Sequence, residues 1–395
     1  MIYVCFEPLF LFLMTRNVNR VLFFLILILC TSVSIKAQEA KKKKLLFAAD
    51  LRLRAEPDWN SRKSDGTYRD DRIRFRFRVR AGITYKPNDW ASFGFRARTG
   101  YAEKQQDPHL TIGDGYHEFD SVPIGFDKLY FKVHKNWLDA WLGRNTFPFI
   151  KHNELFWSDN VSLDGVFLSA SFESSANWID GVTYAGGLFT MLNSFDTFSD
   201  ESFIGILQIG TSHIDNRLKI YPTFYHFNQM PDIPDGNDNY RFEYSIIQIG
   251  AEALVSEHPK ITLGADLYQN IQNYNDNDNI PKDLKNQKKG FVGSAVWSDL
   301  DKKGNFSVGL YYTYIERYAA VDFIAQNDWV RWDYSGQGSR DGRLTNLKGL
   351  EVMSGYRISK MLQLKMRYFM VEQLVPYGTA LETGNRIRLD IDFRF

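Results

Sequence analysis

The sequence predicts an all-β fold, a transmembrane antiparallel up-and-down β-barrel of about sixteen strands. Three observations predict it. Apolar and polar residues alternate with a period of two over many short segments. Short connections between these segments alternate with long ones. Aromatic residues make up 15% of a chain whose mean hydropathy is −0.34, so the fold must show one face to lipid and the other to water.

The first 37 residues have the pattern of a secretory signal peptide. Arg16 and Arg20 precede an apolar run over residues 21–30, and the small residue Ala37 follows a polar stretch. Residues 1–13 are unusual in front of such a segment, which points to Met14 as the true start. The expected division is a signal peptide over 1–37 and an outer-membrane barrel over 38–395. Two alternatives stay open, an N-terminal membrane anchor and a lipoprotein acylated at Cys30, which bulky preceding residues disfavour.

Cleavage after residue 37 changes the charge and the cysteine content. It removes Arg16, Arg20, Lys36 and Glu7, so the formal net charge shifts from +1 to −1. A chain this close to neutral is not expected to bind nucleic acid. Both cysteines lie in the removed piece, so the mature chain has neither a disulfide framework nor thiol chemistry.

The clearest strand lies over residues 71–81. Five arginines there, which we call the arginine ladder, alternate with apolar side chains: Arg72, Arg74, Arg76, Arg78 and Arg80. A helix would scatter these arginines around its axis, whereas a strand places them on one face. The last ten residues repeat the pattern, with Ile387 to Phe395 apolar at every second position.

The same period-two pattern predicts sixteen strands along the chain. They lie near residues 45–56, 71–86, 90–101, 124–133, 138–144, 164–174, 178–191, 202–212, 218–227, 240–256, 261–273, 290–298, 305–319, 347–358, 361–372 and 386–395. An even number of strands is expected for a single-chain bacterial barrel.

The connections between these strands alternate in length. Short ones are 87–89, 134–137, 175–177, 213–217, 257–260, 299–304 and 359–360, and long ones include 57–70, 102–123, 145–163, 228–239, 274–289, 320–346 and 373–385. Short turns at one end and long loops at the other are typical of an outer-membrane barrel. Both termini then lie at the short-turn end, which faces the periplasm.

Several segments over residues 45–170 carry a family resemblance. They are the arginine ladder, the turn over 86–90, the strand over 93–100, and the stretches 142–144, 147–149, 155–157 and 164–166. On these the chain resembles the putative porin family of Gram-negative outer membranes. The resemblance implies passive uptake of solutes, without naming the solute. Sixteen strands leave a water-filled bore, through which we expect small hydrophilic solutes, anionic ones included, to diffuse. The terminal aromatic Phe395 also resembles the end signal that the barrel-assembly machinery recognises.

The basic strands become neighbours when the last strand pairs with the first. The expected pore-lining residues are Arg52, Arg54, Arg72, Arg74, Arg76, Arg78, Arg80, Arg96, Arg98, Lys365, Arg367 and Arg388, with Arg394 beside them. Alternate residues of a strand lie about 6.7 Å apart, where two positive charges repel by roughly 2.5 kcal/mol at an effective dielectric constant near 20. The arginine ladder therefore needs water, interleaved carboxylates or a passing anion.

Two interpretations of these charges stay open, and both can hold. One is a pore wall that attracts anions. The other is a charge network that braces the lumen, with Asp50, Asp390 and Asp392 as partners.

For each of two long loops, two interpretations stay open. Loop 145–163 either folds into the lumen and sets its width or is an ordinary external loop. Loop 320–346 carries Trp329, Trp332 and Tyr334, which either stack on sugars at the cell surface or pack the loop on itself. The alternative function is thus a surface protein with ligand-binding loops and a closed lumen.

Other chemistry is not expected. The acidic groups Asp232, Asp235 and Asp238, then Asp276 and Asp278, lack the spacing of a calcium loop, so neither a metal nor a cofactor is predicted. A lipid hydrolase would need Ser169 or Ser171 beside a histidine that the sequence does not place. Expected partners are outer-membrane lipid and lipopolysaccharide, the barrel-assembly machinery and a homotrimer of the chain itself.

Overall fold

The computed structural model describes residues 44–101, 105–113, 121–176, 178–192, 202–231, 240–298, 300, 302–329 and 342–395. Residues 44–395 form one compact unit. The predicted signal peptide lies outside the described residues. No helix in these ranges is long and apolar enough to cross a membrane.

One antiparallel sheet contains the described strands. In chain order the elements are β1 (Leu45–Arg62), β2 (Arg72–Tyr85), β3 (Ala91–Thr99), β4 (Leu110–Thr111), β5 (Ile124–Lys135), β6 (Leu138–Thr146), β7 (Ser162–Glu173), β8 (Gly181–Leu192), β9 (Ser202–His213), β10 (Leu218–Pro231), β11 (Arg241–Glu257), β12 (Lys260–Asn270), the 3-10 helix η1 (Lys282–Leu284), β13 (Lys289–Ser298), β14 (Phe306–Ile315), the 3-10 helix η2 (Asp322–Ile324), β15 (Leu347–Arg357), β16 (Leu362–Gln373) and β17 (Thr383–Arg394).

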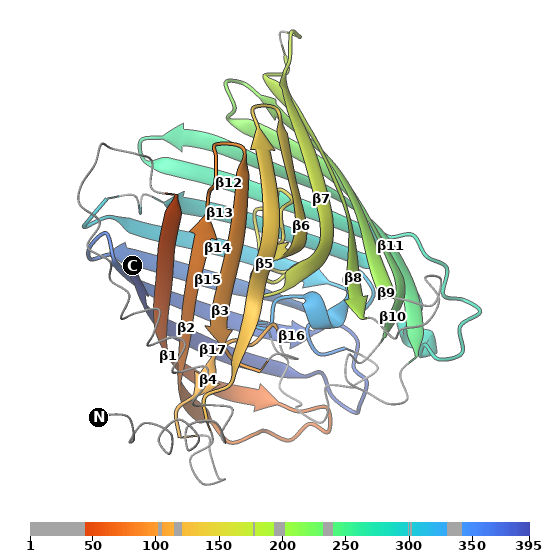
Figure 1. Cartoon of the computed structure of the whole chain (residues 1–395). Coiled ribbons are helices and arrows are strands. Elements are labelled where there is room, and N and C mark those ends of the chain that lie inside the picture. Colours follow the sequence, from red (N-terminus) through yellow and green to blue (C-terminus); the bar gives the residue numbers. More distant parts are fainter. Residues whose placement is uncertain are drawn as a thin grey trace, which may run out of the picture. The chain divides into compact units, whose positions relative to one another are not determined.

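The sheet closes on itself. Strand β1 pairs with β2 on one side and with β17 on the other, so no edge is left unpaired. The two-residue β4 pairs with β2 alone, so sixteen of the 17 strands form the barrel wall. Figure 1 shows these strands following one another around the wall. The predicted class, an antiparallel barrel of sixteen strands, is confirmed.

The two faces of the wall differ in polarity. On β2 the outward side chains Ile73 and Phe75 are 60% and 54% exposed, whereas Arg76 and Arg78 on the other face are 5% exposed. The same alternation continues on β17, where Leu389 is exposed and Arg388 and Asp390 are buried. An apolar exterior and a polar interior match a barrel that stands in lipid.

Exposed tryptophans mark the short-turn end of the barrel. Trp90, Trp137, Trp178 and Trp297 are all about half exposed or more, and each lies in or beside a short connection. Aromatic girdles stand at the interfaces of membrane barrels, where the ring meets lipid and its N–H meets water. This end therefore marks one membrane interface.

Strand boundaries differ from the prediction where charge continues into a predicted loop. Strand β1 runs to Arg62, six residues beyond the expected end, because Glu56 and Asp58 keep the inward alternation and pair across to β2 and β17. Strand β14 ends at Ile315, four residues early, because the chain there turns into the lumen.

Candidate functional site

Strands β17, β1 and β2 carry charged side chains in five rows across the strands. We call this surface the charged wall. From the short-turn end, the rows are Arg394–Asp50–Arg80, Asp392–Arg52–Arg78, Asp390–Arg54–Arg76, Arg388–Glu56–Arg74 and Arg386–Asp58–Arg72. The register of a closed antiparallel barrel fixes these rows, because cross-strand partners share a face.

The predicted carboxylate partners are in place on this wall. Arg54 donates two hydrogen bonds to Asp390, at 2.6 and 2.8 Å. Arg52 does the same to Asp392, at 2.5 and 2.8 Å. Asp50 accepts at 2.8 Å from both Arg78 and Arg80. Paired donors on one carboxylate hold each guanidinium in a fixed plane, so the wall is braced as well as charged.

Glu56 and Asp58 are partners that the sequence reasoning missed. Glu56 is fully buried and lies within 4.0 Å of five arginines of the wall. Asp58 accepts from Arg72 at 2.6 Å and from Arg386 at 2.7 Å. The signal was present, because Glu56 at the end of the predicted strand and Asp58 just beyond it continue the alternation of Arg52 and Arg54.

The wall is unbalanced toward positive charge. Its five rows contain ten arginines and five carboxylates. Loop residues Asp107 and Asp328 add two more carboxylates, the first at 2.6 Å from Arg76 and the second in contact with Arg388. The carboxylates interleave with the arginines, yet a net positive surface remains facing inward.

The neighbouring strands continue the charged surface on each side. On β3, Arg96 donates to Asp127 of β5 at 2.8 and 2.7 Å, and Arg98 donates to the Thr99 carbonyl. On β16, Arg367 contacts Glu351 of β15 and donates to Asp328 at 2.9 Å. Lys365 makes no ion pair within the part of the chain that the structure describes.

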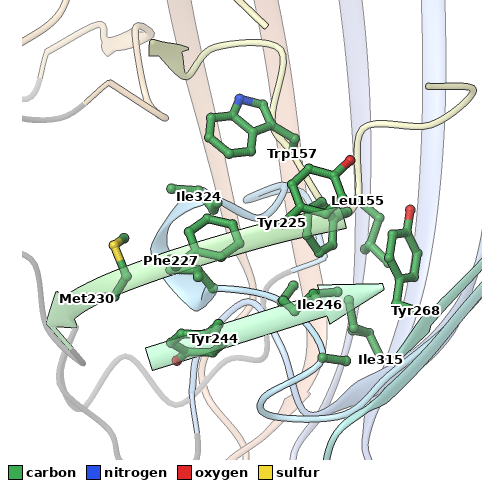
Figure 2. Close-up of a cluster of buried hydrophobic side chains, with 14 of the residues drawn as sticks. Leu155, Trp157, Tyr225, Phe227, Met230, Tyr244, Ile246, Tyr268, Ile315 and Ile324 are labelled. Carbon is green, nitrogen blue, oxygen red and sulfur yellow. The ribbon is translucent and has the colours of Figure 1, made fainter. Parts of the chain in front are cut away.

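The connection between β6 and β7 folds into the barrel, which resolves the choice that the sequence left open for loop 145–163. Leu155, Phe156 and Trp157 are at most 4% exposed. The Phe156 ring lies 4.7 Å from that of Tyr225 on β10 and stacks at 4.8 Å on that of Tyr268 on β12. Figure 2 shows Leu155 and Trp157 in one apolar cluster with side chains of the wall.

Hydrogen bonds fasten this inward loop to strands of the wall other than its own. The buried Asp266 of β12 accepts from Asn153 at 2.6 Å and lies 3.0 Å from Nδ1 of His152. Gln208 of β9 accepts from the N–H of Ile150 and donates to its carbonyl. The loop is therefore held against the inner face of the wall between β9 and β12.

Two further connections enter the lumen and meet the inward loop. In the segment after β14, Gln326 donates its backbone N–H to the Leu155 carbonyl at 2.9 Å, and the Ile324 carbonyl accepts from Ser158. In the segment between β3 and β4, Gln106 donates to the Ala325 carbonyl at 2.6 Å. Three segments far apart in the sequence thus narrow the barrel together.

Trp329 lies in the segment after β14, and its side chain is buried. This side chain is 1% exposed, packs edge-on against Phe369 and donates to Gln326 at 2.9 Å. It is therefore not available to stack on a sugar at the cell surface. Trp332 and Tyr334 lie outside the described residues.

Charged side chains of the lumen shift the pKa values of groups on the inward segments. Burial raises the pKa of Glu154, but Arg367, Lys365 and Lys151 outweigh it and hold that pKa at about 2. Burial and the nearby Arg54 and Arg78 lower the pKa of His109 well below its ordinary value. At neutral pH Glu154 is therefore charged and His109 is neutral.

Two adjacent cavities remain between the inward segments and the wall. The first, of about 210 Å³, is lined by the charged wall and by Glu154, Asn160 and Asp328. The second, of about 360 Å³, is lined by the inward loop and by β13, β14 and β15. Lys365, Arg367 and Glu154 line both.

The other candidate residues from the sequence, the possible calcium ligands and catalytic serines, do not form a metal or catalytic site among the described residues. Asp232, Asp235 and Asp238 lie outside the described residues. In the ranges that are described, including Asp276 and Asp278, no three metal-ligating side chains stand together. Ser171 shares a hydrogen bond with Thr183, at 2.9 Å. The backbone N–H of Phe395 bonds to Ala49, and its ring is 66% exposed.

A sequence model of a known family matches residues 60–289, and its description is putative porin. The chain belongs to this porin family. With the closed sixteen-strand barrel, this makes it a porin of the bacterial outer membrane, a channel for passive diffusion of small solutes.

Solved structures share the fold of this porin. OprB of Pseudomonas putida matches with a TM-score of 0.53 and 14% sequence identity, over 89% of this chain and 94% of that one. The outer membrane channel DcaP of Acinetobacter baumannii matches with a TM-score of 0.51 and 12% identity, over 91% and 100%. No curated protein matches the sequence of this porin.

Proposed function

We propose that this porin prefers anions and that the residues predicted from the sequence, from Arg52 to Arg388, line the path of the solute. The observation that carries the proposal is the charged wall, which holds two arginines for each carboxylate. Inside a narrow channel with low-dielectric walls, such an excess raises the local concentration of anions. The braced network and the anion path are then one structure, because the carboxylates fix the arginines in place.

The test compares an inward arginine with an outward lysine. Arg78→Gln removes one charge and leaves Asp50 paired with Arg80. We expect the anion-to-cation permeability ratio, measured from reversal potentials in a salt gradient, to fall. Lys348→Gln, which changes a partly exposed residue of β15 paired to Glu372, should leave the ratio unchanged. A ratio that Arg78→Gln does not alter would make the arginines structural.

Export and assembly are part of the proposal. Residues 1–37 act as the signal peptide, and the exposed Phe395 at the end of the last strand is recognised by the barrel-assembly machinery. Deletion of Phe395 should lower the amount of folded barrel in the outer membrane without changing the amount exported. Equal amounts of folded barrel would refute the assembly signal.

We further propose that the barrel forms a homotrimer and contacts lipopolysaccharide. Arg144 and Asp164 pair at 2.7 and 2.5 Å on the outward face, beside the exposed Leu142 and Val166. A charge facing hydrocarbon costs about 2–4 kcal/mol at mid-membrane, so a second copy or a lipid headgroup over this pair is favourable. Native mass spectrometry separates trimer from monomer and detects retained glycolipid. We propose no catalytic activity.

A further inference from the structure

Acidic and basic side chains face the same space in the lumen. The smaller cavity, of about 210 Å³, is bordered by Glu154 and Asp159 of the inward loop and by Lys365 of β16. Arginines of the charged wall border it too, and the side chains of Arg52 and Arg80 remain 17% and 22% exposed. A solute in this cavity therefore meets both signs of charge within a small volume.

Glu154 and Lys365 have bonding capacity left for a ligand. Lys365 is partly exposed, and among the described residues it makes neither a hydrogen bond nor an ion pair. The side chain of Glu154 is 30% exposed, and in the same part of the chain it has one ionic contact, at 3.7 Å to Arg367, and no hydrogen bond. Glu154 and Lys365 do not pair with each other, because their charged atoms lie more than 4.0 Å apart.

We infer that the lumen binds a small zwitterion, an amino acid whose ammonium and carboxylate groups are several atoms apart. Its carboxylate lies at Lys365 and its ammonium at Glu154, with Arg52 and Asp159 as the next charges on each side. A molecule with both charges is attracted at each end, whereas the carboxylates of the inward loop repel a plain anion and the charged wall repels a plain cation. Both residues also border the cavity of about 360 Å³, which extends the space beside them.

Glu154 carries the charge that this recognition needs. Burial raises its pKa, but the cations around it outweigh burial and hold the pKa at about 2. The carboxylate is therefore ionised at neutral pH, and an ionised carboxylate forms strong hydrogen bonds with an ammonium group. This inference rests on the proposed path of the solute through the lumen, and it names what that path binds.

The test uses single channels of the full-length refolded protein in potassium chloride at neutral pH, with three probes built on one carbon chain. Aminobutyrate with its amino group at the far end of the chain carries both charges, butyrate carries only the carboxylate, and butylammonium carries only the ammonium. The aminobutyrate should block the current saturably. Butyrate and butylammonium should not block it at the same concentration.

Each of the two charges has its own variant. Lys365→Met should weaken the aminobutyrate block about tenfold or more, as expected for losing a charged hydrogen bond, and Lys365→Arg should keep the block. Glu154→Gln should weaken the aminobutyrate block as much and should let butyrate block instead, a change that a folding defect does not produce. The matched controls are Lys348→Met and Glu372→Gln, because these residues pair at 3.4 Å with side chains 42% and 44% exposed. Both controls should leave the block unchanged.

The outcomes separate this inference from the proposed function. Equal block of the wild-type channel by butyrate or by butylammonium would overturn the zwitterion assignment. An anion-selective channel that aminobutyrate does not block would overturn this inference and leave the proposed function standing. A channel without anion preference that aminobutyrate still blocks would refute the proposed function and leave the binding site in place.

Discussion

Glu56 is the residue on which the charged wall depends most. Its carboxylate is fully buried and shared by five guanidinium groups, and Arg388 lies 2.9 Å from it. Removing the negative partner of a buried charge group leaves uncompensated cations, which is more costly than losing an exposed pair. The wall is therefore most sensitive at its carboxylates, which are fewer than its arginines.

We expect Glu56→Gln to lower the free energy of unfolding by about 3–5 kcal/mol, the cost of breaking a buried ion pair. Urea unfolding of the refolded barrel in detergent measures it. The matched control is Glu257→Gln, because Glu257 pairs with Arg217 at 2.6 Å where both side chains are about half exposed. That change should cost about 1 kcal/mol or less. Equal losses for the two variants would contradict the role of Glu56.

Glu154 makes the stability of the folded barrel depend on pH. Its pKa is held at about 2 in the folded protein, below the ordinary value of 4.5. A lowered carboxyl pKa stabilises the fold fully above the ordinary value, and the stabilisation is lost as the pH falls through the folded pKa. We therefore expect the contribution of Glu154 to stability to be constant from neutral pH to about 5 and to disappear between about 4.5 and 2.

The selectivity of the channel reports the charge of Glu154. Glu154→Gln should raise the anion-to-cation permeability ratio at pH 7 and should remove the part of the stability profile lost between about pH 4.5 and 2. Reversal potentials measure the first and urea unfolding at several pH values the second. A variant with the same ratio as the wild type would place this carboxylate away from the ion path.

At the scale of elements, the inward loop sets the width of the lumen. Phe156 is the ring that joins it to β10 and β12, at 4.7 Å from Tyr225 and 4.8 Å from Tyr268. We expect Phe156→Ala to cost about 3–5 kcal/mol of stability and to raise single-channel conductance, since the loop loses its ring contacts with β10 and β12. Phe172→Ala, at a half-exposed ring on the outer face, should leave conductance unchanged.

The strands could be predicted from the sequence and the path of the loops could not. Period two is local information, so Ile73, Phe75 and the arginine ladder identify β2 without knowledge of its neighbours. The inward course of residues 147–161 depends on partners such as Tyr225, Tyr268 and Asp266, which lie about 70 to 110 positions away. No pattern within the loop records those contacts.

The candidate site could be predicted in part for the same reason. The sequence predicts that the last strand pairs with the first, which places Arg52 and Arg54 near Asp390 and Asp392. These ion pairs are present in the structure. Asp107 and Asp328 were not foreseen, because they reach Arg76 and Arg367 from loops. The two-residue period predicts the strands of the barrel wall, but it does not predict the loops that enter the lumen.

At the scale of the whole molecule, closure of the sheet connects the fold with the function. Pairing of β17 with β1 removes the free edges and in the same step assembles ten arginines and five carboxylates on one inner surface. The three inward segments then confine the water-filled space to the neighbourhood of that surface. Under the proposed function, a solute that crosses the barrel passes the charged wall.

The reversal potential of the wild-type channel in a planar bilayer, under a gradient of potassium chloride, tests this account most directly. We predict stable open steps and a reversal potential of the sign that chloride preference requires. A potential of the opposite sign would contradict the anion path, and a folded barrel without open steps would contradict the channel itself.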